Sequence, residues 1–131
     1  MRREELINSL KNSINVNIPV FLWRVAKPEY DELPIIIVRD TDDKIDEVAS
    51  GSTEHNLKIE IELLMSDNTL TSSKVRETIN SILQSIKETE YSLGDYLSLD
   101  SVDLDLEQQE RIIGRGMIEL TMKYHTEKWE I

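Results

Sequence analysis

The chain has 131 residues, with 26 acidic against 15 basic side chains and a formal net charge of −11. Such a surface repels a phosphate backbone, which argues against a protein that reads nucleic-acid sequence. The absence of cysteine excludes disulfide scaffolds and thiolate metal sites. No apolar run is long enough to span a bilayer, so we expect no membrane association. The length fits a single domain over residues 1–131.

The first part of the chain predicts one helix and two strands. Apolar residues recur at helical spacing over residues 3–14, which indicates a short amphipathic helix. Residues 20–25 are rich in β-branched and aromatic side chains and predict a strand, with Trp23 in the core. The apolar residues at 34–38 predict a second strand. Pro34 is compatible with it, because proline is tolerated at a strand's first position.

Residues 40–54 are acidic and nearly free of large apolar groups. We predict a long mobile loop here, of the kind that is usually either functional or disordered. Asp40, Asp42 and Asp43 begin like a calcium-binding loop, but Ile45 stands where that motif needs glycine. The favoured interpretation is a solvated acidic loop, with a weak divalent-ion site as the alternative. No cofactor is predicted.

The second part of the chain gives the strongest periodicities. Strict alternation over residues 57–65 predicts a strand with one buried and one wet face. Residues 75–86 predict an amphipathic helix, for which the polar residues at 71–73 are candidate N-caps. Two more strands are predicted over residues 97–106 and 111–125. Gly114 and Gly116, in the last strand, indicate a bulge or a close backbone approach.

These elements predict an α+β fold in the order α-β-β-β-α-β-β. The alternating faces and short turns favour a mostly antiparallel sheet of about five strands, with two helices packed on one face. Asp100, Asp103 and Asp105 lie on or beside a predicted strand. Charged residues at a sheet edge block unwanted strand pairing, and we favour that role over acid–base chemistry.

The candidates for catalysis are weak. His55 and His125 stand at the ends of predicted strands and lack metal-ligand spacing, so we expect two solvent-facing histidines. No serine or threonine lies in a nucleophile elbow, and no glycine-rich phosphate loop is present. We therefore predict that the chain is not an enzyme.

Trp129 lies near the end of the sequence, beyond the last predicted strand. Tryptophan brings a large apolar area to a contact and is enriched in binding hot spots. Two interpretations stay open at this point. Trp129 is either an interface anchor, or a cap on its own core through a tail that folds back.

Four stretches together resemble phage tail terminator proteins, the family that includes the minor tail protein U of lambda-like phages. The segment 34–39 resembles the family's strand after its first hairpin, and 51–61 resembles the polar loop that leads into its long central strand. The segment 75–86 is similar to its amphipathic helix, and 124–129 to its closing Tyr-x-Thr ending.

The resemblance implies a structural role in virion assembly. Such proteins form hexameric rings at the head-proximal end of a tail tube, and subunits can be monomeric until they meet the tube. The ring stops tube polymerisation and presents a surface to the head-completion or neck protein, without enzymatic activity. DNA passes through the lumen without specific binding. Assembly takes place in the bacterial host's cytoplasm, and the ring stays in the virion tail.

The predicted assembly interface comes from residues 40–54 and 125–131, with the candidates Asp42, Asp43, Glu54, His55, His125, Lys128 and Trp129. An acidic lumen would repel passing DNA at short range. Two other functions stay open. One is a related neck or tail-completion protein that joins head to tail. The other is a small-molecule-binding regulatory domain, because α+β sheets commonly host ligands.

Overall fold

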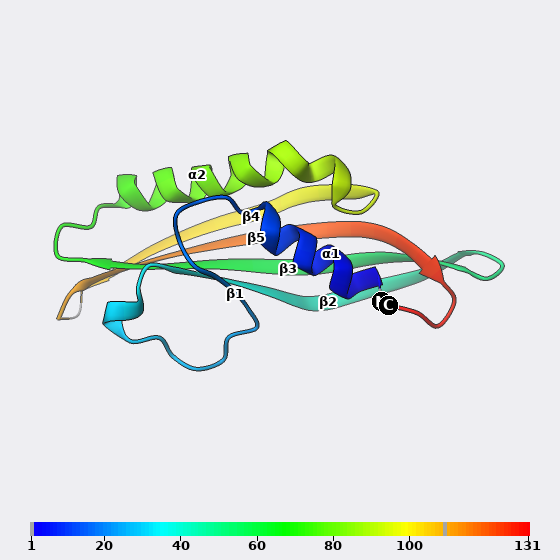
Figure 1. The fold of residues 1–131 in the computed structure, drawn as a ribbon, viewed down its shortest axis with the longest axis horizontal. Helices are drawn as coiled ribbons and strands as arrows, with labels where there is room; N and C mark the ends of the chain where they lie inside the picture. The colour runs from blue at the N-terminus through cyan, green and yellow to red at the C-terminus, as the bar shows by residue number, and fades with distance from the viewer. Residues whose placement is uncertain (1, 109) are drawn as a thin grey trace.

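The computed structural model describes residues 2–108 and 110–131 as an α+β fold with a five-stranded sheet and two helices (Figure 1). Two short 3-10 helices, η1 (Tyr30–Glu32) and η2 (Glu90–Ser92), interrupt the predicted order of elements. The helices are α1 (Arg2–Ser13) and α2 (Ser72–Thr89), and among the described residues neither is long and apolar enough to cross a membrane. The strands are β1 (Val20–Leu22), β2 (Ile35–Ala49), β3 (Ser52–Asp67), β4 (Tyr96–Gln108) and β5 (Ile112–Glu127).

The sheet is mixed, with the strand order β1-β2-β3-β5-β4. Three neighbouring pairs are antiparallel, as predicted for most of the sheet, but β1 runs parallel to β2. A parallel pair needs a long crossover connection, and residues 23–34 supply it. The three-residue β1 and the longer β4 are therefore the two edge strands.

Both helices contribute to one hydrophobic core. Helix α1 buries Leu6, Ile7 and Leu10, and α2 buries a stripe at helical spacing. These side chains form one cluster with alternate residues of β2, β3 and β5. Helix α2 begins after Thr71, whose side chain accepts a hydrogen bond from the Lys74 backbone N–H at 3.2 Å. Of the three candidate N-caps, Thr71 holds this position.

The two glycines of β5 let α2 approach the sheet closely. A Cβ atom at Gly116 would lie 2.7 Å from Ile79 Cδ1, and one at Gly114 would lie 2.8 Å from Val75 Cγ2. The pairing of β5 with β3 and β4 is continuous here, so there is no bulge. Of the two interpretations drawn from the sequence, the close approach is correct.

The prediction of a loop over residues 40–54 is wrong. This segment forms most of a long hairpin, in which β2 continues to Ala49 and β3 begins at Ser52. The turn uses Gly51 at φ +79°, a conformation that glycine adopts without strain. Residues 40–49 include few large apolar groups because this half of β2 lies mostly in solvent. The signal that was overlooked is the Ser50-Gly51 pair, which is typical of a turn.

The expectation that Trp23 is a core residue is also wrong. Strand β1 ends at Leu22, and the Trp23 side chain is half exposed. Its backbone lies at φ 50°, which is unusual for a bulky residue. The backbone N–H donates to the Val38 carbonyl at 3.0 Å, and the indole N–H donates to Asp40 Oδ1 at 2.6 Å. These two bonds hold the Trp23 ring beside Asp40 of β2, at the edge of the sheet where β1 ends.

The sheet face turned away from the helices is mostly polar, and we call it the open face. Its centre is the carboxylate of Glu62 on β3, which accepts from Arg39 at 3.1 Å and from Arg115 at 2.5 Å. The segment between β1 and β2 runs away from the helices (Figure 1) and brings Leu33 beside Leu64 at one end of this face. Ile35 and Ile37 of β2 also point to this side and are buried. The charged side chains lie along the rest of the open face.

We predict that Gly116→Ala lowers the free energy of unfolding by about 1–3 kcal/mol, because the added methyl group overlaps Ile79. Urea unfolding measures the loss. In an Ile79→Val background, which removes the Cδ1 atom, the same substitution should cost less. Equal costs in the two backgrounds would show that α2 does not rest on this glycine.

Candidate functional site

The end of the β2–β3 hairpin and the C-terminal tail form one surface. The Lys128 backbone N–H donates to the Gly51 carbonyl at 3.0 Å, and the Arg3 N–H donates to the Ile131 carbonyl at 3.3 Å. The tail therefore folds back between the hairpin turn and the start of α1 (Figure 1). We call the exposed side chains here the hairpin–tail surface: Ile45, Val48, Lys128, Trp129 and Ile131.

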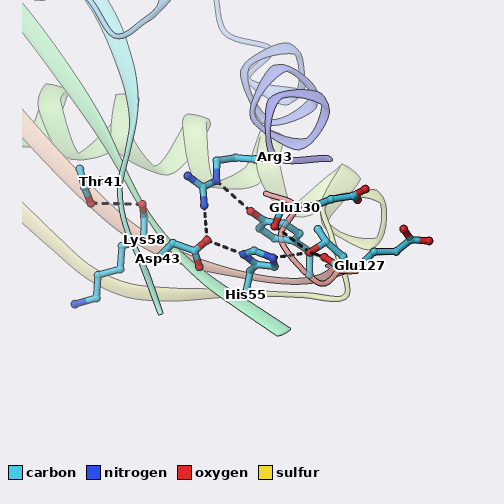
Figure 2. Close-up of polar contacts among 9 residues, drawn as sticks. Arg3, Thr41, Asp43, His55, Lys58, Glu127 and Glu130 are labelled. Carbon is cyan, nitrogen blue, oxygen red and sulfur yellow. Dashed lines mark hydrogen bonds and ion pairs between the residues drawn. The ribbon is translucent and has the colours of Figure 1, made fainter. Parts of the chain in front are cut away.

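A buried polar network anchors this surface. His55 has no solvent exposure, so the expectation that it faces solvent is wrong. Its Nδ1 lies 2.7 Å from Asp43 Oδ2, and its Nε2 lies 2.7 Å from Thr126 Oγ1. Arg3 of α1 forms an ion pair with the same Asp43 oxygen (Figure 2). One network thus joins α1, both arms of the hairpin and the end of β5.

Tyr124 closes the network on one side. Its ring stacks on the His55 imidazole, with centroids 4.5 Å apart and planes 3° from parallel. Its hydroxyl accepts a hydrogen bond from Arg3 Nε at 3.1 Å. Burial raises the pKa of Tyr124, and the guanidinium of Arg3 offsets part of that rise. The phenol therefore stays neutral and continues to accept from Arg3.

Both ring nitrogens of His55 are hydrogen-bonded within the network. If Nδ1 carries the proton, it donates to the Asp43 carboxylate, and Nε2 accepts from the Thr126 hydroxyl. The Thr126 oxygen also lies 2.9 Å from the Glu127 carbonyl and 3.2 Å from the Glu130 carbonyl. A hydroxyl has one hydrogen, so His55 and the two tail carbonyls compete for it.

Carboxylate, imidazole and hydroxyl stand in the same order as in a Ser-His-Asp triad. In such a triad the Thr126 hydroxyl would be the nucleophile, but it is half-buried and hydrogen-bonded to the Glu127 and Glu130 carbonyls, and the imidazole that would serve as its base is fully enclosed. A hollow of about 390 Å³ lies between Ile45, Thr53 and Trp129, and neither His55 nor Thr126 lines it. The arrangement favours a clamp that holds the hairpin and tail together.

His125 lies on the open face, opposite to the side on which His55 lies. Its Nδ1 contacts the Asp95 carboxylate, and its Nε2 lies 3.2 Å from Glu54 Oε2. Glu54 also pairs with Lys123 at 3.4 Å. The hydrogen bond to Asp95, followed by the charges of Asp95 and Glu54, raises the pKa of His125. This imidazole is a second, exposed link between β3, β5 and the start of β4.

The predicted interface residues separate into two groups. Asp43 and His55 lie in the buried network, out of reach of a partner's direct contact. The other five are accessible: Asp42, Glu54, His125, Lys128 and Trp129. Trp129 is 91% exposed and so does not cap the core, although the tail itself folds back. The sequence analysis missed Arg3, Tyr124 and Thr126 as members of the network around His55.

The aspartates do not converge into a cation site. Asp40 accepts from Trp23, and Asp43 pairs with Arg3 and His55. Asp100, on the edge strand β4, accepts from Ser98 at 3.2 Å and from Thr121. Over residues 2–108 and 110–131, no group of three or more His, Asp or Glu side chains is placed to hold a metal ion.

Comparison with known proteins adds no assignment: no protein-family model matches the chain, and no curated protein matches it.

We predict that Asp43→Asn lowers the free energy of unfolding by about 2 kcal/mol, because Arg3 loses its ion pair in a mostly buried position. Urea unfolding gives the value. The neighbouring Asp42→Asn is the matched control, since Asp42 is exposed, and should change stability by less than about 0.5 kcal/mol. Similar losses for the two variants would contradict the clamp.

We predict that NMR titration finds the pKa of His125 above the ordinary value of about 6.5, and that Asp95→Asn lowers it. Because the folded-state pKa is raised, the stabilisation from His125 is fully present below the unfolded pKa. It is lost as the pH rises through the folded pKa. Asp103→Asn, farther along β4, should leave the titration of His125 unchanged. An unshifted His125 would disprove the link.

Proposed function

We propose that this chain is a structural subunit of a phage or prophage tail, which assembles as a ring on the head-proximal end of the tail tube and ends its polymerisation. The support from geometry is the contrast between the two faces of the sheet. One face is covered by both helices, whereas the open face is broad and charged. A subunit that lines a channel needs such an uncovered polar face.

The open face is acidic on balance, which supports a role as the lumen lining. Strand pairing places acidic side chains of four strands on this face, and they outnumber the basic ones. The basic residues are Arg39, Lys44, Lys58, Arg115 and Lys123. The acidic residues are Asp42, Asp46, Glu54, Glu60, Glu62, Asp103, Asp105, Glu107, Glu119 and Glu127. A lumen of this charge repels passing DNA at short range.

The hairpin–tail surface is the proposed contact with the next protein of the phage tail. Trp129 projects into solvent from a backbone at φ 70°, which is strained for a residue with a large side chain. Lys128 lies 5.4 Å from the centroid of the Trp129 ring and 3.6 Å from Glu47. An exposed aromatic on a tail that is held at both ends loses little conformational entropy when a partner binds.

The test is tube assembly in the presence of the chain. Tail tube protein polymerised with this chain should give capped tubes of restricted length in negative-stain electron microscopy. Unlimited tubes would reject the proposal. Tubes that grow freely, combined with a chain that binds the head-completion protein, would instead favour a neck component. Lys58 and Lys123 lie on the open face together with most of its carboxylates. A ring in which this face points outward, away from the channel, would reject the acidic lumen.

We predict that Trp129→Gly abolishes capping while the free energy of unfolding changes by less than about 1 kcal/mol. Glycine relieves the strain at φ 70°, and its greater freedom in the unfolded chain opposes that gain. Urea unfolding and tube-length distributions measure the two effects. The neighbouring Glu130→Gln is the control and should cap normally. Capping by the Trp129→Gly variant would remove this residue from the interface.

A further inference from the structure

One long side of β4 has no neighbouring strand. Among the strands that the structure describes, β4 pairs with β5 alone and lies at the side of the sheet opposite to β1 (Figure 1). After an irregularity at Asp100, its pairing with β5 is continuous over residues 101–107, which we call the β4 edge. The outer backbone groups of such an edge are available to pair with another strand.

One row of side chains along the β4 edge is apolar and faces the helices. A Cβ atom at Gly114 of β5 would lie 3.3 Å from Leu106 Cδ2 and 2.8 Å from Val75 Cγ2 of α2, which places Leu106 on the helix side. Val102 and Leu104 share this side, because side chains alternate along a strand. Val102 and Leu106 are 43% and 37% exposed, so α2 leaves the outer part of the row uncovered.

The second row of the β4 edge is acidic and points to the open face. Asp103, Asp105 and Glu107 are exposed, and over residues 2–108 and 110–131 no basic side chain forms an ion pair with them. The one basic residue opposite this row on β5 is Arg115, whose Nε donates to Glu62 of β3 at 2.5 Å. A single arginine shared with Glu62 leaves the row with a net negative charge.

A second copy of this chain does not offer a matching edge. Two β4 edges brought together would place carboxylates opposite carboxylates and repel. The other edge strand, β1, is only three residues long, and acidic side chains lie beside it. Asp40 accepts from the Trp23 indole, and Glu32 pairs with Arg24. Neither described edge of a second copy therefore supplies a basic row.

We propose that the β4 edge binds an extended segment of a different protein, in which lysine or arginine alternates with apolar residues. The segment adds a strand to the sheet, and its backbone hydrogen bonds supply affinity while its alternate side chains supply specificity. Side chains that stand opposite each other in paired strands share a face, so the basic ones meet the acidic row and the apolar ones cover Val102 and Leu106. This contact is separate from the hairpin–tail surface and does not depend on the proposed function.

A peptide of about seven residues that alternates lysine with valine is the probe, since that length is usual for a strand. The net charge of −11 attracts any cationic peptide, so the matched control has the same lysines and valines in two separate blocks. At physiological ionic strength, calorimetry should show the alternating peptide binding several-fold more tightly than the control. In NMR spectra its binding should shift the amide signals of residues 101–107.

Charge variants of the protein show whether the acidic row is the site. Asp103→Lys should weaken binding of the alternating peptide several-fold. Asp46→Lys is the matched control, because it changes the net charge equally at an exposed position of β2. Its affinity should stay close to that of the wild type, since salt screens distant charges. Circular dichroism shows whether both variants are folded.

Backbone methylation of the peptide tests for strand pairing. Along a strand, the N–H groups of alternate residues point to the same side. Methylating the amides of the lysines, or those of the valines, therefore removes the donors on one side only. One of these two peptides should lose its binding and the other should keep it.

Equal binding of the alternating and the blocked peptide overturns the proposed contact, because net charge then accounts for it. Equal effects of Asp103→Lys and Asp46→Lys, or of the two methylations, also overturn it. A wild-type dimer that shifts the amide signals of residues 101–107 without peptide would do the same, since a second copy would then occupy the edge. The capping of tail tubes is measured separately, so its failure would leave this contact standing.

Discussion

The unbroken register between β3 and β5 is the constraint on which the other features depend. The two strands pair residue by residue from Ser52 to Asp67 without a bulge. Because side chains alternate between faces, a slip of one residue would move every core side chain into solvent. The same register places His55 beside Tyr124 and within reach of Thr126, and it places Glu54 beside His125. The core, the buried clamp and the open face are therefore consequences of a single pairing.

Periodicity in the sequence located α2, most of β5 and the central part of β3, because each of these has one buried side. The alternation that identified residues 57–65 also predicts His55, if it is followed backwards by one more step. We expected His55 to face solvent because the two histidines lack metal-ligand spacing, and its partner Thr126 is far away in sequence. Long-range partners of this kind leave no local pattern. The acidic half of β2 was also missed. It pairs with β3 along its length but is mostly exposed, so its sequence shows no alternation of buried and exposed residues.

The distribution of charge has a physical role that is independent of any particular partner. Acidic residues dominate both the open face and β4, so the net charge of −11 is concentrated on particular surfaces. A strand edge with unpaired backbone groups attracts other strands, and a row of carboxylates limits which strands can approach. The same residues that would make a proposed lumen repel DNA also restrict how subunits contact one another. Solubility and specificity of assembly would then have a common electrostatic origin.

The fold-back of the tail brings the two ends of the described chain together. The backbone N–H of Arg3 donates to the Ile131 carbonyl, so the start of α1 and the end of the tail lie side by side (Figure 1). A purification tag or fluorescent protein fused at either end would therefore emerge beside Trp129. Neighbouring ends also suit a circular permutant, in which a short linker joins them and new ends open at an exposed turn. Such a permutant would present the hairpin–tail surface without free ends.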